Sequence, residues 1–188
     1  MKSFKEFLIE LGEYPGSFEI ANLGVGRATQ YGQQVFGGHL YDVMPDFHRN
    51  YLALRRIDRK YGHTLRKDMP AIDDKQVHDF EAGLAPIRYK DERISAAKLR
   101  PVQRQIYLDK VLTAIRDHGV DSAKRFIAKS EIMTDKDRDI IDGHHRWTSA
   151  MLLDPKLRMT ASFIKANLGK VMSRAQSYTD KVGNKRNK

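Results

Sequence analysis

Residues that could bind an anion gather between Asp139 and Trp147. Ile140 and Ile141 form a short apolar, β-branched pair that is typical of a buried strand. Gly143 permits a sharp turn after them, because a residue without Cβ adopts positive φ at little cost. The spacing that follows predicts a helix, and a helix that starts directly after a strand points free backbone N–H groups out of the turn. The pattern therefore predicts a phosphate or carboxylate site.

The side chains of this turn allow two interpretations. His144, His145 and Arg146 can donate hydrogen bonds to a bound anion. In the structural alternative, Asp142 only shapes the turn, the two His are solvated and Trp147 belongs to the core. A zinc site at the His pair is a poor interpretation, since adjacent helical positions point about 100° apart.

The hexapeptide from Asp142 to Trp147 resembles the signature of the ParB/sulfiredoxin superfamily, and is most similar to that of the free serine kinases. The resemblance covers roughly Arg93 to Ala166. It implies a small mixed-sheet α/β domain whose turn, from Gly143 to Arg146, holds the phosphates of ATP, ADP or CTP. It also implies that Asp142 works in phosphoryl transfer, and we expect the same carboxylate to accept Mg²⁺.

The segment Arg100-Pro101-Val102-Gln103 is a second candidate. The resemblance implies that it faces the turn, and that Gln103 stands where the serine kinases carry a catalytic Glu. An amide has no useful basicity at neutral pH, so Gln103 argues against serine as substrate. A Pro followed shortly by Gln is common in ParB partitioning proteins, which favours nucleotide binding or hydrolysis. The alternative is an exposed loop amide.

Further residues complete the candidate site. Pro101 and Arg104 join the expected phosphate-binding set, and Glu131 is a candidate replacement base. Asp137 and Asp139 offer a second carboxylate for the metal, although solubility of a hairpin explains them equally well. The absence of Cys excludes sulfiredoxin chemistry, because that reaction needs a Cys where His144 stands.

Composition bounds the class of protein. The 188 residues carry a formal net charge of +10, with 40% hydrophobic and 31% charged residues, which is typical of a globular chain. No apolar run approaches the ~20 residues that span a bilayer. We therefore expect a cytoplasmic protein with no membrane partner. The basic balance favours polyanions, so nucleic acid is a candidate partner.

Three segments are expected: a helical N-terminal extension at 1–88, a ParB/sulfiredoxin-like domain at 89–168 and a basic tail at 169–188. The tail from Lys170 to Lys188 holds six Lys or Arg against one Asp, and we expect it to be solvated and mobile or to touch nucleic acid non-specifically. In the extension we expect helices over 3–11, 45–61 and about 73–84. The glycine-rich stretch 12–38 is expected to form turns or an extended arm.

The expected order within the domain is β-α-β-β-α-β. The pattern predicts a first strand at 93–99, ended by Pro101, and a helix that stops at Gly119. The remaining predictions are strands at 126–133, 138–142 and 157–164, with a helix over 144–154 between the last two.

The expected function is nucleotide binding at the turn, coupled to phosphoryl transfer, nucleotide hydrolysis or phosphodiester cleavage of the ParB-like nuclease type. The alternative is a non-enzymatic basic module that binds nucleic acid or a larger assembly and keeps the turn as a pocket or a structural corner. An oligomer is compatible with either of these functions. The sequence leaves open whether the chain is an enzyme.

Overall fold

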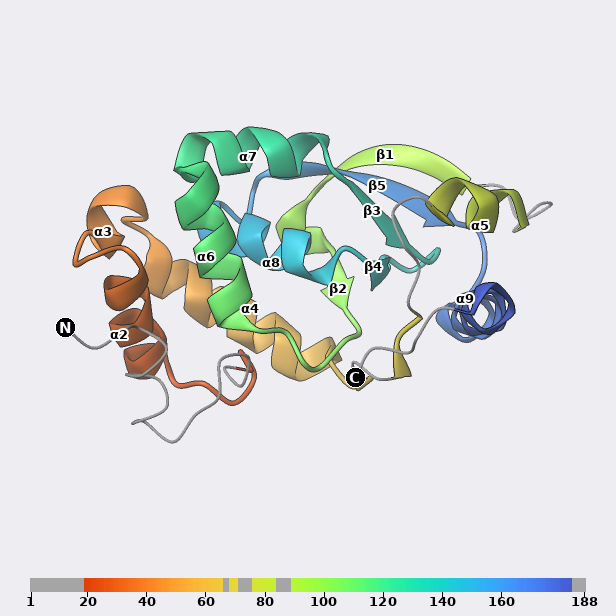
Figure 1. Cartoon of the computed structure of the whole chain (residues 1–188), viewed down its shortest axis with the longest axis horizontal. Helices are drawn as coiled ribbons and strands as arrows, with labels where there is room; N and C mark the ends of the chain where they lie inside the picture. The colour runs from red at the N-terminus through yellow and green to blue at the C-terminus, as the bar shows by residue number, and fades with distance from the viewer. Residues whose placement is uncertain (1–18, 66–67, 71–75, 84–88, 184–188) are drawn as a thin grey trace.

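The computed structural model describes residues 19–65, 68–70, 76–83 and 89–183. Over these residues the chain is a mixed α/β structure, in which a five-stranded sheet has helices on both faces and further helices precede it (Figure 1). The strands are β1 (Tyr89–Ser95), β2 (Arg100–Pro101), β3 (Glu131–Thr134), β4 (Asp139–Asp142) and β5 (Arg158–Ile164).

The strand order across the sheet is β1-β5-β3-β4-β2. β1 runs antiparallel to β5 and β3 runs antiparallel to β4, whereas β5 with β3 and β4 with β2 are parallel pairs. Because β2 and β4 are parallel, their carboxyl ends lie at the same edge of the sheet. This arrangement brings the segment after β2 close to the turn after β4.

Successive side chains in a strand point to opposite faces of the sheet, and each face packs against its own hydrophobic cluster. Ile132 and Ile140 face the larger cluster, which α8 (His144–Leu153), α6 (Leu108–His118) and α7 (Val120–Lys129) cover. Met133 and Ile141 face the smaller cluster on the other side, with α5 (Val77–Gly83) and α9 (Leu168–Val182). Figure 1 shows α8 in the middle of the molecule and α9 at the far edge.

Helix α8 confirms the helix that was predicted to begin at His144. Trp147 is fully buried and donates from Nε1 to the Ala96 carbonyl at 2.9 Å. Eight of its ten residues are buried, so the helix is fixed on nearly all sides and the turn before it has a rigid base.

The expectation of turns or an extended arm at 12–38 is wrong for residues 25–35, whereas residues 20–22 and 36–38 are turns. Residues Val25–Val35 form helix α2, because Ala28, Tyr31 and Val35 recur at helical spacing and bury one stripe. A short helix, α3 (Leu40–Val43), follows it. The predicted helix over 3–11 lies outside the described residues.

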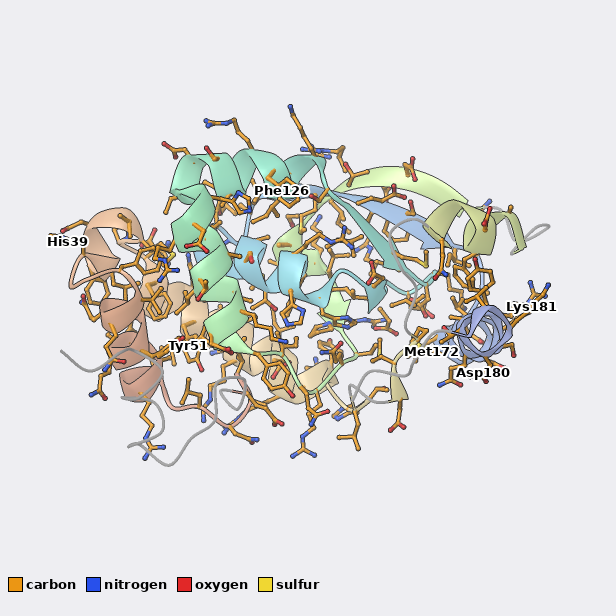
Figure 2. All side chains as sticks on the ribbon, in the orientation of Figure 1. His39, Tyr51, Phe126, Met172, Asp180 and Lys181 are labelled. Atoms are coloured by element: carbon orange, nitrogen blue, oxygen red, sulfur yellow. The ribbon has the colours of Figure 1, made fainter. Side chains whose placement is uncertain are left out.

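The helix predicted over 45–61 is confirmed as α4 (Phe47–Tyr61). Its Tyr51, labelled in Figure 2, is fully buried. The Tyr51 hydroxyl donates to the Leu23 carbonyl at 3.0 Å. Asn50 donates to the Leu152 carbonyl of α8 at 2.9 Å. The helices before the sheet therefore share one core with the helices that cover it. Within the helix predicted over about 73–84, the structure has α5 (Val77–Gly83), and residues 73–75 lie outside the described part.

Two strand predictions need correction. The stretch 126–133 is not one strand: α7 runs to Lys129, since Ala123 and Ile127 bury a helical stripe, and β3 starts only at Glu131. The first strand ends at Ser95 and a 3-10 turn follows at Ala96–Lys98. The chain then pairs again at β2, where Pro101 is tolerated because β2 is an edge strand.

The expected tail is largely helical. Helix α9 begins with the Asn167 side chain accepting from the Lys170 N–H at 3.0 Å, and it buries Val171 and Ala175 against the sheet. A mobile end is therefore wrong for 168–182; the last five residues lie outside the described part. Within the described ranges no helix is both long and apolar enough to cross a bilayer.

Candidate functional site

The turn between β4 and α8, formed by Asp142 to Trp147, has the predicted strand–glycine–helix geometry. Gly143 has φ +95° and is the N-cap residue of α8. A Cβ added there would lie 3.0 Å from Ile132 Cγ1, so both the backbone conformation and the tight space favour glycine. No side chain caps this helix N-terminus and its first turn has no acidic residue. The positive end of the helix dipole is therefore not offset locally by a cap.

Asp142 and Arg146 face each other across the first turn of α8. Their side chains form an ion pair of 2.6 Å between Asp142 Oδ2 and Arg146 Nη2. Both are partly exposed, at 44% for the Asp142 side chain and 29% for that of Arg146. A cation and a carboxylate thus stand together at the mouth of the turn, accessible to a ligand.

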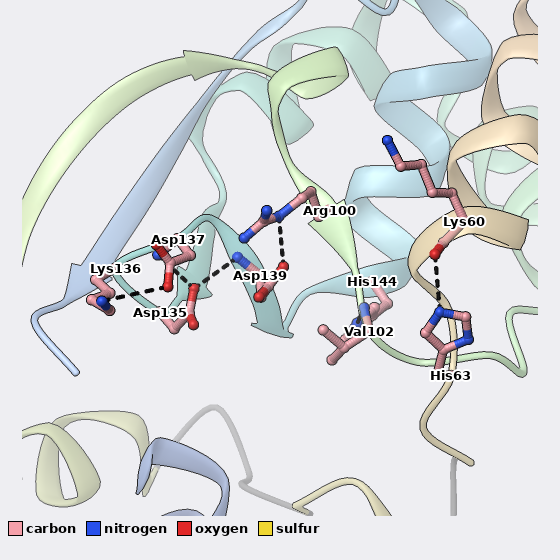
Figure 3. Close-up of polar contacts among 9 residues, drawn as sticks. All are labelled: Lys60, His63, Arg100, Val102, Asp135, Lys136, Asp137, Asp139 and His144. Atoms are coloured by element: carbon pink, nitrogen blue, oxygen red, sulfur yellow. Dashed lines mark hydrogen bonds and ion pairs between the residues drawn. The ribbon is translucent and has the colours of Figure 1, made fainter. Parts of the chain in front are cut away.

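His144 holds the segment after β2 against the turn. His144 is 4% exposed, and its Nε2 accepts the backbone N–H of Val102, beside which it lies in Figure 3, at 3.3 Å. The same nitrogen accepts the N–H of Gln103 at 3.2 Å. The segment therefore lies beside the turn as expected, although β2 rather than β1 leads into it. Since this nitrogen accepts from the protein backbone, His144 positions the loop and does not offer that atom to an anion.

Gln103 is covered by the segment that follows α4. The N–H groups of His63 and Thr64 donate to the Val102 carbonyl at 3.0 and 2.8 Å, and Arg104 N–H donates to the Thr64 carbonyl at 2.8 Å. Gln103 is 6% exposed and its side-chain amide donates to the Gln105 carbonyl. An exposed loop amide is therefore wrong. Among its neighbours in the candidate set, Pro101 is buried and Arg104 is exposed.

Glu131 is held within the sheet by a neighbouring strand. It is the first residue of β3, and its carboxylate accepts from the Ser162 hydroxyl of β5, which also donates to Asp91. The β3 residue that is paired with Asp142 is Met133 rather than Glu131. Glu131 therefore has a structural role between β3 and β5.

The aspartates before β4 shape the β3–β4 hairpin. Asp135 is buried, and its Oδ1 accepts the N–H groups of Asp137 at 2.8 Å and Asp139 at 2.9 Å (Figure 3). Asp139 pairs with Arg100 Nε at 2.7 Å. Burial, and then the neighbouring Asp135 carboxylate, raise the pKa of Asp139, while Arg100 opposes that shift. These carboxylates have structural partners at the start of β4, whereas Asp142 ends it.

A metal ion at the turn would need most of its coordinating oxygens from a bound phosphate and water. In the described part of the chain no three His, Asp or Glu side chains gather as a metal site. Mg²⁺ is commonly held by one or two carboxylates together with substrate phosphates and water. Asp142 fits that mode, because its carboxylate is partly exposed and lies beside an anion-binding geometry.

A small pocket that sequence patterns did not predict adjoins the turn. It has a volume of about 130 Å³ between α6, α7 and α8, and His145, Arg146 and Ser149 form one wall. Its floor is apolar, and Lys110 and His118 line it as well. Phe126 of α7, labelled in Figure 2, stacks on His118 with ring centroids 5.8 Å apart. The volume is below the roughly 300 Å³ of a typical ligand pocket, so this pocket fits only part of a nucleotide-sized ligand.

Asp58 of α4 is a buried carboxylate that the sequence analysis missed. It is 0% exposed, and neither oxygen has a hydrogen-bond partner in the described structure. Burial, and then Glu19, raise its pKa to about 7, against the opposing charges of Arg104 and Arg59. The signal was present, since Asp58 continues the buried stripe of Tyr51 and Leu54 at helical spacing.

Similarity to known proteins adds no further evidence on this site. Comparison of the chain with protein-family models, curated proteins and solved structures finds no match. The function has to be argued from the β4–α8 turn itself.

Proposed function

We propose that the chain binds the phosphate groups of a nucleotide at the β4–α8 turn, as a ParB/sulfiredoxin-like domain would. The observation that carries this proposal is the left-handed Gly143 at the uncapped start of α8, with Arg146 in the first turn. Backbone N–H groups, a helix dipole and a guanidinium then act on one anion.

The ion pair between Asp142 and Arg146 must break before Arg146 can bind a phosphate. A phosphate that arrives alone must compete with the Asp142 carboxylate for Arg146. A phosphate that arrives with Mg²⁺ supplies the metal as a new partner for Asp142, so that Arg146 becomes available to the phosphate oxygens. Nucleotide binding should therefore be stronger with Mg²⁺ than without it.

The pocket beside Arg146 provides a place for a further part of the ligand. Its floor is apolar, with Val111, Ile115 and Ile127, and its wall carries His145. Such a lining accepts a flat apolar group while the charged part of the ligand stays at the turn. ATP, ADP and CTP remain candidates.

Asp142 is the residue on which a reaction would depend. Gln103 is buried and has an amide rather than a base, and the Glu131 carboxylate is bound by the Ser162 hydroxyl. Asp142 would then hold Mg²⁺ or orient the attacking hydroxyl in phosphoryl transfer, nucleotide hydrolysis or phosphodiester cleavage.

A thermal-shift screen with ADP, ATP, CTP and GTP, each with and without Mg²⁺, tests the proposal. A ligand at 100 times its dissociation constant adds about 2.7 kcal/mol to the free energy of unfolding. We expect such a shift with at least one nucleotide, and its loss in Arg146→Ala.

Arg116→Ala is the matched control, because Arg116 is also paired with an aspartate, Asp117, at 2.8 Å. That variant should keep the full shift. If no nucleotide raises the melting temperature, the proposal is wrong and the non-enzymatic basic module is the better account.

A further inference from the structure

A groove lined by cationic side chains lies away from the β4–α8 turn. Its volume is about 390 Å³. It is lined by the end of β1, the 3-10 turn, the residue before β4 and the chain at the start of β5. The charged residues that line it are Arg93, Lys98, Arg138, Lys156, Arg158 and a single carboxylate, Glu92. Because these residues are scattered over the sequence, no local charge run announces the groove.

Two of the arginines are held in place by the sheet. Arg93 Nη1 donates to the Ala128 carbonyl and to Thr160 Oγ1, the latter at 3.3 Å. Arg158 Nη2 donates to the Arg93 carbonyl at 2.7 Å. A guanidinium has five N–H donors, so each retains donors for a ligand, and little side-chain freedom is lost when a ligand binds.

The other three cations are Lys98, Arg138 and Lys156. Within the described ranges the side chains of Lys98, Arg138 and Lys156 form no ion pair, and all three residues are exposed. Like charges that share a groove repel one another, and a bound polyanion removes that repulsion.

The backbone at Arg138 supports a functional reason for this cation. Arg138 has φ +72° and is the one non-glycine residue with positive φ in the described structure. A left-handed conformation is unfavourable for a residue with a Cβ, and glycine would avoid that cost. An arginine at this position therefore retains a charge in the groove at the expense of stability.

The groove is separate from the turn. Lys156 follows the C-terminal end of α8, whereas Gly143 precedes its N-terminal end, and the ten residues of α8 span about 15 Å. Arg138 likewise precedes β4, while Asp142 ends it. A ligand at one site does not occupy the other.

We infer that this groove binds the phosphate backbone of a double-stranded nucleic acid without reading its sequence. None of the residues lining the groove is aromatic, so it has no platform on which unpaired bases could stack. The exposed large hydrophobic residues in the described structure lie elsewhere, at Tyr41, Val43, Leu52, Phe126 and Val182, so the groove has no anchor for a membrane. Charge without stacking or anchoring fits a duplex backbone.

The test uses the full chain, a fluorescently labelled 24-base-pair DNA duplex and anisotropy over a series of KCl concentrations. The groove variant combines Lys98→Gln, Arg138→Gly and Lys156→Gln, which removes three charges and relieves the positive φ. We expect its affinity at 50 mM KCl to fall about tenfold or more. The slope of log affinity against log salt should become shallower by about 0.9 for each phosphate that the variant no longer neutralises.

The matched control combines Arg56→Gln, Lys170→Gln and Lys181→Gln, three exposed cations on α4 and α9. It removes the same net charge, and it should retain most of the wild-type affinity. Equal losses in both variants would overturn the groove assignment, as would unchanged binding in the groove variant.

Two further arms address other partners, and thermal melts of both variants verify that they fold. A single strand of the same sequence should bind more weakly than the duplex. Binding to vesicles with 20% anionic phospholipid that depends on the same three residues, without duplex binding, would overturn the inference in favour of a membrane surface.

Discussion

Asp142 and Arg146 are bound to each other across the first turn of α8, with 2.6 Å between Oδ2 and Nη2. The turn thus carries its own counter-ion at the point where its geometry favours an outside anion. In the proposed function, Asp142 would hold Mg²⁺ and Arg146 would bind a phosphate, so that the two side chains would separate when a nucleotide binds.

Replacing Asp142 by Asn tests this exchange. The folding cost should be below about 1 kcal/mol, because the ion pair is partly exposed. Without the competing carboxylate, nucleotide binding in EDTA should be retained or strengthened, while the enhancement by Mg²⁺ and any turnover should disappear. Calorimetric titration with and without Mg²⁺ measures both effects. An equal loss of binding under both conditions would contradict the assigned role.

His144 is expected to act in folding rather than in binding. His144→Ala removes the acceptor of two backbone N–H groups in a buried position and should cost about 2–4 kcal/mol. His144→Gln, whose side-chain oxygen can accept, should recover part of that loss. Urea denaturation gives the values, and His63→Ala, at an exposed His bonded to the Lys60 carbonyl, is the control. A loss as small as that of the control would show that the loop is held by other contacts.

Gly143 should resist substitution more than another left-handed glycine. Gly143→Ala combines φ +95° with a Cβ 3.0 Å from Ile132, and should cost more than the roughly 1–2 kcal/mol of the backbone alone. Gly183→Ala, at φ +73° in the same left-handed region and with open space around its Cβ, should show only the backbone cost. Thermal or urea melts compare the two, and equal costs would mean that the turn is not tightly packed.

Asp58 should make the stability of the fold depend on pH. Its pKa is raised to about 7 from 3.8, so between these values the folded chain binds a proton that the unfolded chain has released. Stability is therefore greatest below pH 4 on this account and falls as the pH rises through 7. Asp58→Asn should be more stable than wild type at pH 8, by on the order of 4 kcal/mol, and this advantage should vanish near pH 4. Urea midpoints at several pH values measure it; an advantage that does not vary with pH would be contrary evidence.

Local patterns were enough to predict the elements around the turn. Ile140 and Ile141, the glycine after them and the periodic residues of α8 agree with one another, and the strand, turn and helix are found there. The same is true of α6, where Leu112 and Ile115 form the stripe. These predictions succeeded because propensity, turn chemistry and periodicity all indicated the same elements.

Other features depended on contacts that a linear pattern does not contain. The stretch from Phe126 to Met133 has enough apolar residues for a strand, but its first part belongs to a helical stripe that begins at Ala123. Pro101 was predicted to end a strand. It is instead part of β2, because β2 lies at the edge of the sheet, and that position is known only from the folded structure. The roles of His144 and Gln103 likewise follow from the approach of the segment after α4, which no local motif indicates.

The most direct measurement is a ¹⁵N–¹H correlation spectrum of the chain, recorded while a nucleotide and Mg²⁺ are added. The account predicts saturable shifts of the backbone amides from Gly143 to Trp147 and of the Arg146 side-chain Nε–H, with the amides of Glu92 to Lys98 unchanged. Shifts confined to the cationic groove, or the absence of shifts at the turn under saturating nucleotide, would contradict the claim that the β4–α8 turn is a phosphate site.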